Sequence, residues 1–104
     1  VTGDLGAVGH DTLEELFHRD GVKLGKFYTD CGVLIFDRER QDVHSGGSGC
    51  GCSAAVVCSH IVSEMRSGRL NKVLFVGTGA LLSAVSPLQG ETVPSIAHAV
   101  LLTN

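Results

Sequence analysis

The cysteines of this chain could form disulfides, bind a metal or act as reactive thiols, and their spacing helps to distinguish these possibilities. Cys31, Cys50, Cys52 and Cys58 form an even set, which permits three disulfide pairings. A structural zinc site would need two pairs spaced as C-x₂₋₄-C or H-x₃₋₅-H, whereas the chain offers only one C-x-C. We therefore predict reduced cysteines that pack as small hydrophobic side chains, with no metal and no cofactor. A metal site and a reactive thiol are the alternatives, since Cys50 and Cys52 precede a predicted helix.

A glycine-rich run at residues 44–53 is the second feature that could hold a ligand. Gly49–Ala54 fits G-x-G-x-x-A, but a dinucleotide loop should follow an apolar strand and precede a strand that ends in an acid. The preceding residues are polar and the next apolar run ends at Thr78, so we predict no nucleotide site. The glycines either let a helix start pack closely against backbone or, with the hydroxyls of Ser48 and Ser53, hold a carboxylate at the helix N-terminus.

The helices that must position these residues follow from hydrophobic spacing. Thr12–Glu15 fits a capping box, so a helix should begin there and end at Gly21. A second helix is predicted over residues 53–67, with Met65 on its buried face and Gly68 at its end. The other residues predicted on that face are Ala54, Val57, Cys58, Ile61 and Val62.

Three apolar runs predict strands. Residues 31–36 are β-branched and aromatic, and residues 73–76 form a continuous apolar run typical of a sheet covered on both faces. Residues 96–103 form the last predicted strand, in which we expect His98 to be a buried, hydrogen-bonded histidine. The order of elements predicts an α/β fold, and because no linker divides the chain, residues 1–104 are predicted to be a single segment.

Composition excludes several classes of protein. The chain is 43% hydrophobic and 18% charged, which is typical of globular proteins, and its net charge of −3 gives no basic surplus for nucleic acid. No apolar run approaches the roughly 20 residues needed to span a bilayer. The chain begins with Val1 rather than Met and lacks the regions of a signal peptide, which we interpret as the mark of a truncated piece.

Five stretches, taken together and in order, are far more specific than any single glycine motif. They lie at residues 1–6, 30–35, 45–54, 73–83 and 89–98. They resemble the C-terminal part of the stage V sporulation protein AD family, a thiolase-like family of spore-forming bacteria. The resemblance implies a thiolase-like α/β fold, in which this chain supplies part of the C-terminal half of a layered αβαβα body, with a mixed sheet and two main helices.

The resemblance also bears on catalysis. Thiolases carry a catalytic histidine just before the glycine-rich helix start and a cysteine at the end of the following strand, and this chain has Ser48 and Phe75 there. The region of the ketoacyl-synthase histidine corresponds to residues 2–4, which hold no histidine. Neither serine nor phenylalanine can act as the general base, so the resemblance implies that the chain is not an enzyme. A shift that brings His44 into play would break the match of Gly51–Ser53.

By resemblance, the chain belongs to a protein that binds dipicolinic acid, alone or with calcium, and supports its uptake into the developing spore. Other stage V sporulation proteins are the implied partners, and the spore interior, peripheral to the inner spore membrane, is the implied location. An acyl-transferase with Cys50 or Cys52 as nucleophile and a structural docking module are the alternatives. No residue is expected to be catalytic; the expected ligand contacts are Asp4, Ser48, Gly49, Cys50, Gly51, Cys52, Ser53, Gly77 and Thr78.

The loop at residues 3–6 should follow a strand of the sheet, of which the sequence contains almost nothing. Without that strand, residues 73–76 or a neighbouring strand should have an unpaired edge and exposed apolar surface. We therefore expect self-association, for example as a homodimer, or dependence on further polypeptide.

Overall fold

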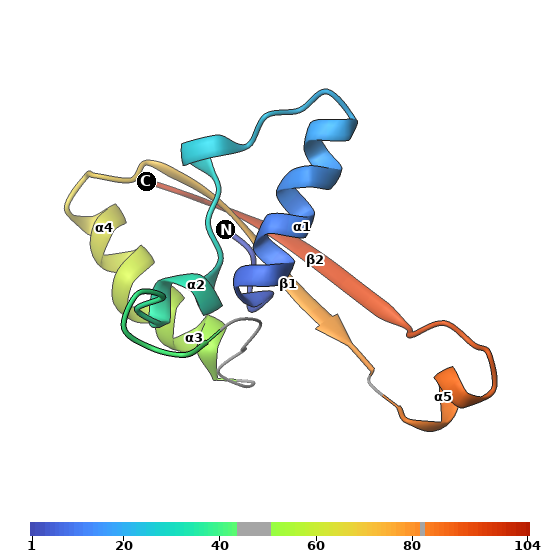
Figure 1. Ribbon diagram of the computed structural model, residues 1–104. Coiled ribbons are helices and arrows are strands. Elements are labelled where there is room, and N and C mark those ends of the chain that lie inside the picture. The colour runs from blue at the N-terminus through green and yellow to red at the C-terminus, as the bar shows by residue number, and fades with distance from the viewer. Residues whose placement is uncertain (44–50, 82) are drawn as a thin grey trace.

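The computed structural model describes residues 1–43, 51–81 and 83–104 (Figure 1). These residues form a mixed α/β structure with a two-stranded sheet. One end of the sheet lies among the helices of the first two thirds of the chain, and the other end projects away from them toward a short helix at Val85–Leu88. In chain order the elements are α1 (Gly6–Arg19), η1 (Gly25–Phe27), α2 (Cys31–Ile35), α3 (Cys52–Val56), η2 (Val57–Ile61), α4 (Val62–Arg66), β1 (Lys72–Ala80), α5 (Val85–Leu88) and β2 (Ser95–Thr103).

The sheet consists of β1 and β2, which pair antiparallel from Lys72 opposite Thr103 to Ala80 opposite Ser95. Both predicted strands are confirmed, but β2 is exposed along nearly its whole length and Leu74 of β1 is 53% exposed. The prediction of a sheet covered on both faces is therefore wrong for the described residues. The buried histidine is wrong too, because His98 is exposed on an edge strand opposite Gly77.

One continuous helix follows the glycine-rich run, formed by α3, η2 and α4. Its middle turn is a π-helix, which places one extra residue in a turn and shifts the buried face. The buried positions are therefore spaced by four, five and four residues rather than by a regular helical period. They are Cys52, Val56, Ile61 and Met65. The helix, its buried Met65 and its end at Gly68 (φ 75°) are confirmed, whereas the predicted core residues Ala54 and Cys58 are exposed.

Helix α1 begins at Gly6, well before the predicted capping box. The Thr12 hydroxyl lies inside the helix, where it donates a 2.8 Å hydrogen bond to the carbonyl of Val8, so the predicted start is wrong. The amide of Gly6 instead donates to the carboxylate of Asp30, so its hydrogen-bond acceptor comes from a distant part of the chain. The predicted end is confirmed, because Gly21 has a φ of 82° just after the last turn.

The strand predicted over residues 31–36 is wrong, because the structure forms helix α2 there. The residues have high β-propensity, but Asp30 caps the helix by accepting a 2.9 Å hydrogen bond from the amide of Gly32. The short helix also buries Cys31 in the core. Capping and burial therefore override the local propensity of residues 33–36.

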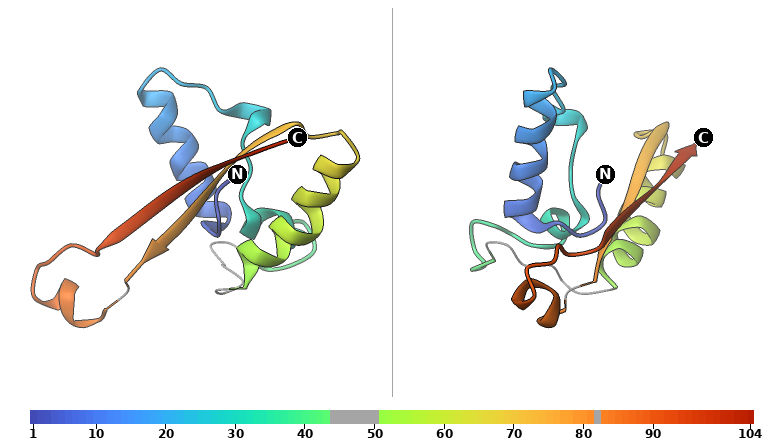
Figure 2. Two further views of the ribbon diagram at one scale, coloured as in Figure 1. Left: turned by 180° about the vertical axis from the view of Figure 1, so that it is seen from behind. Right: turned by 90° about the vertical axis from the view of Figure 1, so that its right-hand side faces the viewer.

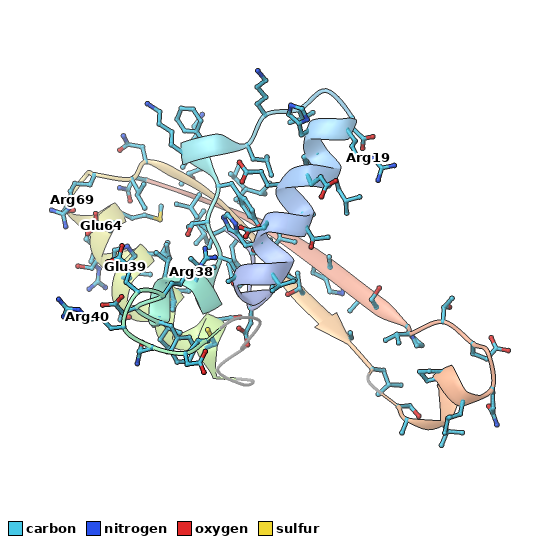
Figure 3. The ribbon with its side chains drawn as sticks, viewed as in Figure 1. Arg19, Arg38, Glu39, Arg40, Glu64 and Arg69 are labelled. Carbon is cyan, nitrogen blue, oxygen red and sulfur yellow. The ribbon has the colours of Figure 1, made fainter. Side chains whose placement is uncertain are left out.

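The core lies between β1, α2 and the helix of α3–α4. Figure 2 shows α1 on one side of the β1–β2 ribbon and α3–α4 on the other. The buried cluster comprises Cys31, Cys52, Val56, Ile61, Met65 and Val73, with Val1, Leu70, Phe75 and Leu102 partly buried against it. In Figure 3, Glu64 and Arg69 meet at the end of α4, where both guanidinium N–H groups donate to the carboxylate and hold the turn into β1.

Candidate functional site

A fully buried carboxylate, that of Asp30, organises the residues around the candidate site. Its Oδ1 accepts hydrogen bonds from the amides of Gly6 (3.0 Å) and Gly32 (2.9 Å). Its Oδ2 accepts from the hydroxyl of Thr2 (2.6 Å) and the amide of Leu5 (2.9 Å). Burying a carboxylate is costly unless it is hydrogen-bonded, and these four donors meet that requirement. Asp30 thus fixes the loop at residues 2–6 and the start of α2 in one arrangement.

The network extends from Thr2 toward α1. The Oγ1 of Thr2 lies 3.0 Å from the hydroxyl of Tyr28, whose ring stacks on His10 at 4.5 Å between centroids. Burial raises the pKa of Tyr28, so its hydroxyl is protonated at neutral pH. His10 in turn contacts the carboxylate of Asp11 through Nδ1 at 3.0 Å. The stack fastens α1 to the segment that leads into Asp30.

Three segments that are distant in sequence meet at Gly3, and we call this place the Gly3 junction, formed by Gly3, Ser53 and Thr78. The amide of Gly3 donates to the carbonyl of Val76 at 2.9 Å, which sets the loop against β1. A Cβ on Gly3 would lie 2.9 Å from Oγ of Ser53 and 3.4 Å from the amide nitrogen of Thr78. The structure therefore brings together Ser53 and Thr78, two of the predicted ligand contacts, and leaves no room there for a side chain on Gly3.

Asp4 follows the junction directly. Its Oδ1 is buried and has no hydrogen-bond partner among the described residues. This oxygen lies beside Gly32, where a Cβ would come within 2.6 Å of it and 3.0 Å of Oδ1 of Asp30. Position 32 therefore requires glycine. Because buried polar atoms are nearly always hydrogen-bonded, the free capacity of Asp4 marks it as a group that could accept from a ligand or coordinate a cation.

The remaining predicted contacts lie elsewhere. Cys52 is buried in the hydrophobic core beside α2, and Gly51 is exposed with open space around it. Gly77 belongs to β1, where it pairs with His98. The other predicted residues lie outside the described part of the chain; they are Ser48, Gly49 and Cys50, together with the alternative His44.

The described cysteines, Cys31, Cys52 and Cys58, lie in different environments. Cys31 and Cys52 pack in the core as predicted, whereas Cys58 is exposed on the helix. Burial, with the nearby charge of Asp30, raises the pKa of the Cys31 thiol to about 11, so this sulfur is protonated and unreactive at neutral pH. Phe75 is partly buried against the core.

Within the described ranges, no three His, Cys, Asp or Glu side chains lie close enough together to hold a metal ion. None of the helices found in the same ranges is long and apolar enough to cross a membrane. A cation at Asp4 would therefore need oxygen ligands from a bound molecule, water or other polypeptide.

Comparison with known proteins decides the family. The family model of stage V sporulation protein AD matches residues 1–103. The chain belongs to the stage V sporulation protein AD family. Stage V sporulation protein AD of Bacillus subtilis (strain 168) is 48% identical to it over 101 residues, which cover 97% of this chain and 30% of that relative. The chain thus spans less than a third of the relative's length, and membership in the stage V sporulation protein AD family implies a function in sporulation.

The sequence prediction missed the residues that build the network, Asp30, Thr2 and Tyr28. The sequence does carry one signal for Asp30, because Asp is among the residues preferred at the N-cap of a helix. The signal was hidden by the apolar run that follows, which predicts a strand. Nothing in the sequence marks Thr2 or Tyr28, since their hydrogen-bond partners lie at least 26 residues away.

Proposed function

We propose that this chain is part of a non-catalytic, thiolase-like protein that binds dipicolinic acid and supports its uptake into the developing spore. The observation that carries the proposal is the Gly3 junction, where the hydroxyls of Ser53 and Thr78 lie next to the loop that contains Asp4. Family membership supplies the sporulation setting. The thiolase resemblance supplies the layered αβαβα body, and the resemblance to the sporulation family supplies the proposed location in the spore interior, peripheral to the inner spore membrane.

The ligand we favour at the junction is the calcium complex of dipicolinate rather than the free dianion. The hydroxyls of Ser53 and Thr78 are suitable donors to a ligand carboxylate. The free oxygen of Asp4, however, would repel an unneutralised dianion. Calcium, which takes oxygen ligands, would turn that repulsion into attraction by lying between the ligand and Asp4.

The absence of catalysis is supported by the groups that stand where thiolase chemistry would need a nucleophile or base. Phe75 replaces the second cysteine, and Cys52 is only 2% exposed. Incubation of the protein with an acyl thioester, followed by intact mass spectrometry, should give no acyl adduct. A stable adduct on Cys50 or Cys52 would instead support the acyl-transferase alternative.

Isothermal titration of the full-length family protein with dipicolinate, with and without calcium, tests the proposed function. Ser53→Ala and Thr78→Val at the corresponding positions should each weaken binding about tenfold, because each removes one hydrogen bond worth roughly 1–1.5 kcal/mol. Ser59→Ala is the matched control, since its hydroxyl donates to the carbonyl of Ala55 on the exposed face of the helix. No saturable binding, or equal losses in all three variants, would refute the proposal.

A docking role is the second candidate, and the projecting end of the β1–β2 ribbon favours it. Leu81, Val85 and Leu88 there are 69%, 57% and 87% exposed. Large exposed apolar side chains that gather on one projection are typical of an interaction surface. If other stage V sporulation proteins dock here, Leu88→Lys should abolish their co-purification with the full-length protein and leave dipicolinate binding unchanged. Retained co-purification would contradict the docking role of this end.

A further inference from the structure

An apolar groove of about 610 Å³ runs along the edge of β1 that faces away from β2. Leu13 and Phe17 of α1 line one wall, and Ile61 lines the opposite wall. Val1 and Leu74 lie along the sheet edge between them. The groove therefore lies between the two helical sides that Figure 2 shows on either side of the ribbon.

The sheet edge inside the groove already carries the first bonds of a parallel strand pair. The amide of Val76 donates to the carbonyl of Val1 (2.8 Å), and the amide of Gly3 donates to the carbonyl of Val76 (2.9 Å). The nitrogen of Val1 donates to the carbonyl of Leu74 (2.8 Å). Because backbone groups alternate between the two edges of a strand, the amide of Leu74 and the carbonyl of Lys72 face the same edge. They are the next two pairing positions of this ladder.

The walls of the groove determine which side chains an added strand should carry. Successive side chains of a strand point to opposite faces, so they would alternate between the α1 wall and the wall that contains Ile61. Both walls are mainly apolar, although His60 and Glu64, on the same helix as Ile61, also line the groove. Phe17 and Leu74 are 40% and 53% exposed with the groove empty. A strand that fits should therefore be apolar at consecutive positions, as are strands buried on both faces.

We propose that the groove is a strand-acceptor site, filled by an extended apolar segment that lies in line with Val1, runs parallel to β1 and pairs with Leu74 and Lys72. The segment comes from the part of the family chain that lies outside the matched region. That part is large, because the match covers only 30% of the Bacillus subtilis relative. The ladder begun by Val1–Gly3 sets the direction of the added strand, and the two apolar walls set its composition.

Occupancy of the groove also bears on the candidate site. A strand in line with Val1 leads directly into Thr2, which is bonded to Asp30, and into Gly3 at the junction. The added strand would thus hold the junction loop from one side while Asp30 holds it from the other. This inference stands whether or not the junction binds dipicolinate.

Overlapping ten-residue peptides that cover the unmatched part of the relative provide the probe. Each is titrated into the ¹⁵N-labelled 104-residue protein, and amide hydrogen exchange is followed by NMR. One peptide with consecutive apolar residues should bind saturably and slow exchange of the Leu74 amide at least tenfold. N-methylation at alternate residues of that peptide, on the edge facing β1, should abolish binding because it removes the ladder donors.

A pair of variants on α1 provides the matched control. Leu13→Asp places a charge in the groove wall and should weaken peptide binding at least tenfold, whereas Leu16→Asp lies outside the groove on the same helix and should not. If Leu13→Asp does not fold, the comparison of the unmodified and N-methylated peptides tests the proposal by itself. The proposal is overturned if no peptide binds, if both variants weaken binding equally, or if Leu74 becomes protected with rising protein concentration alone, because a second copy would then be the occupant.

Discussion

Replacing Asp30 by asparagine is the most direct perturbation of the network that holds the candidate site. The side chain keeps its shape, but one carboxylate oxygen becomes an NH₂ group. Each oxygen accepts two hydrogen bonds, one pair from Gly6 and Gly32 and the other from Thr2 and Leu5. Whichever way the amide is turned, one pair of donors faces another donor, and the charge that strengthens all four bonds is lost.

The magnitude follows from these four bonds. A hydrogen bond to a charged group contributes about 1.5–3 kcal/mol, and two of the four are removed outright. If the amide turns its NH₂ toward Thr2, the Thr2 hydroxyl can rotate toward Tyr28, 3.0 Å away, which recovers part of the loss. We expect Asp30→Asn to lower the free energy of unfolding by about 3–5 kcal/mol. For a domain of ordinary stability, about 5–15 kcal/mol, this is a large fraction.

Urea unfolding followed by far-UV circular dichroism measures the loss. Asp11→Asn is the matched control, because it makes the same chemical change at a carboxylate that is 63% exposed. The control should lower stability by about 1 kcal/mol or less. Amide exchange adds a local measurement, in which the amides of Leu5 and Gly6 should lose protection in Asp30→Asn before the amides of β1 do.

Two results would refute this reasoning. One is an Asp30→Asn loss no larger than that of Asp11→Asn, which would mean that the buried carboxylate is not a net source of stability. The other comes from the double mutant with Thr2→Val. If the losses of Asp30→Asn and Thr2→Val simply add, the 2.6 Å bond between the two side chains carries no energy of its own.

Three further predictions follow from the same structure. The pKa of Cys31 is about 11 in the folded protein, against an ordinary value of 9.0. The contribution of Cys31 to the free energy of unfolding is therefore complete below about pH 9 and is lost as the pH rises toward 11. Stability measured by urea unfolding should fall over that range by up to about 3 kcal/mol through Cys31, and Cys31→Ala should show a smaller fall, since the raised pKa of Tyr28 is unchanged. In the same assay, Gly32→Ala should lower the free energy of unfolding by about 2–4 kcal/mol, because the added Cβ would clash with the carboxylate of Asp4. Gly51→Ala is the control and should leave stability unchanged, because Gly51 has open space around it. Equal losses in the two variants would contradict the packing described at Gly32. Val100→Lys on β2, at a side chain 53% exposed, should reduce self-association in light scattering, and a wild-type monomer would rule that association out.

The strongly periodic elements were predictable from the sequence. The helix after the glycine-rich run and the two strands depend mainly on their own hydrophobic spacing, and glycines such as Gly68 mark helix ends by a conformation that other residues avoid. The π turn at Val57–Ile61 was not predictable from a regular period, so the residues buried before Ile61 are Cys52 and Val56 rather than the predicted Ala54 and Cys58. A single added residue per turn changes which side chains point inward.

The site was predictable only in part because its decisive interactions are long-range. Ser53 and Thr78 carry hydroxyls close to glycines in the sequence, and the structure brings both to the Gly3 junction; their contact with a ligand stays a prediction. The start of α1 and the helical state of α2 depend on the carboxylate of Asp30, which overrides both a capping box and a β-prone run. No spacing rule connects a carboxylate with an amide 24 residues earlier.

The position of Thr2 between two partners has a kinetic consequence. Its backbone forms parallel bridges to both Asp30 and Val76, the second of which closes a long loop of chain. Contacts this distant in sequence form slowly, since the entropy of closing the loop is lost before the contact is gained. We expect the helix of α3–α4 and the β1–β2 hairpin to fold first. The first six residues would then dock last as one cooperative unit and be the first to detach. The fraction of time for which the junction is formed is then set by the local docking equilibrium of this segment rather than by the stability of the whole chain.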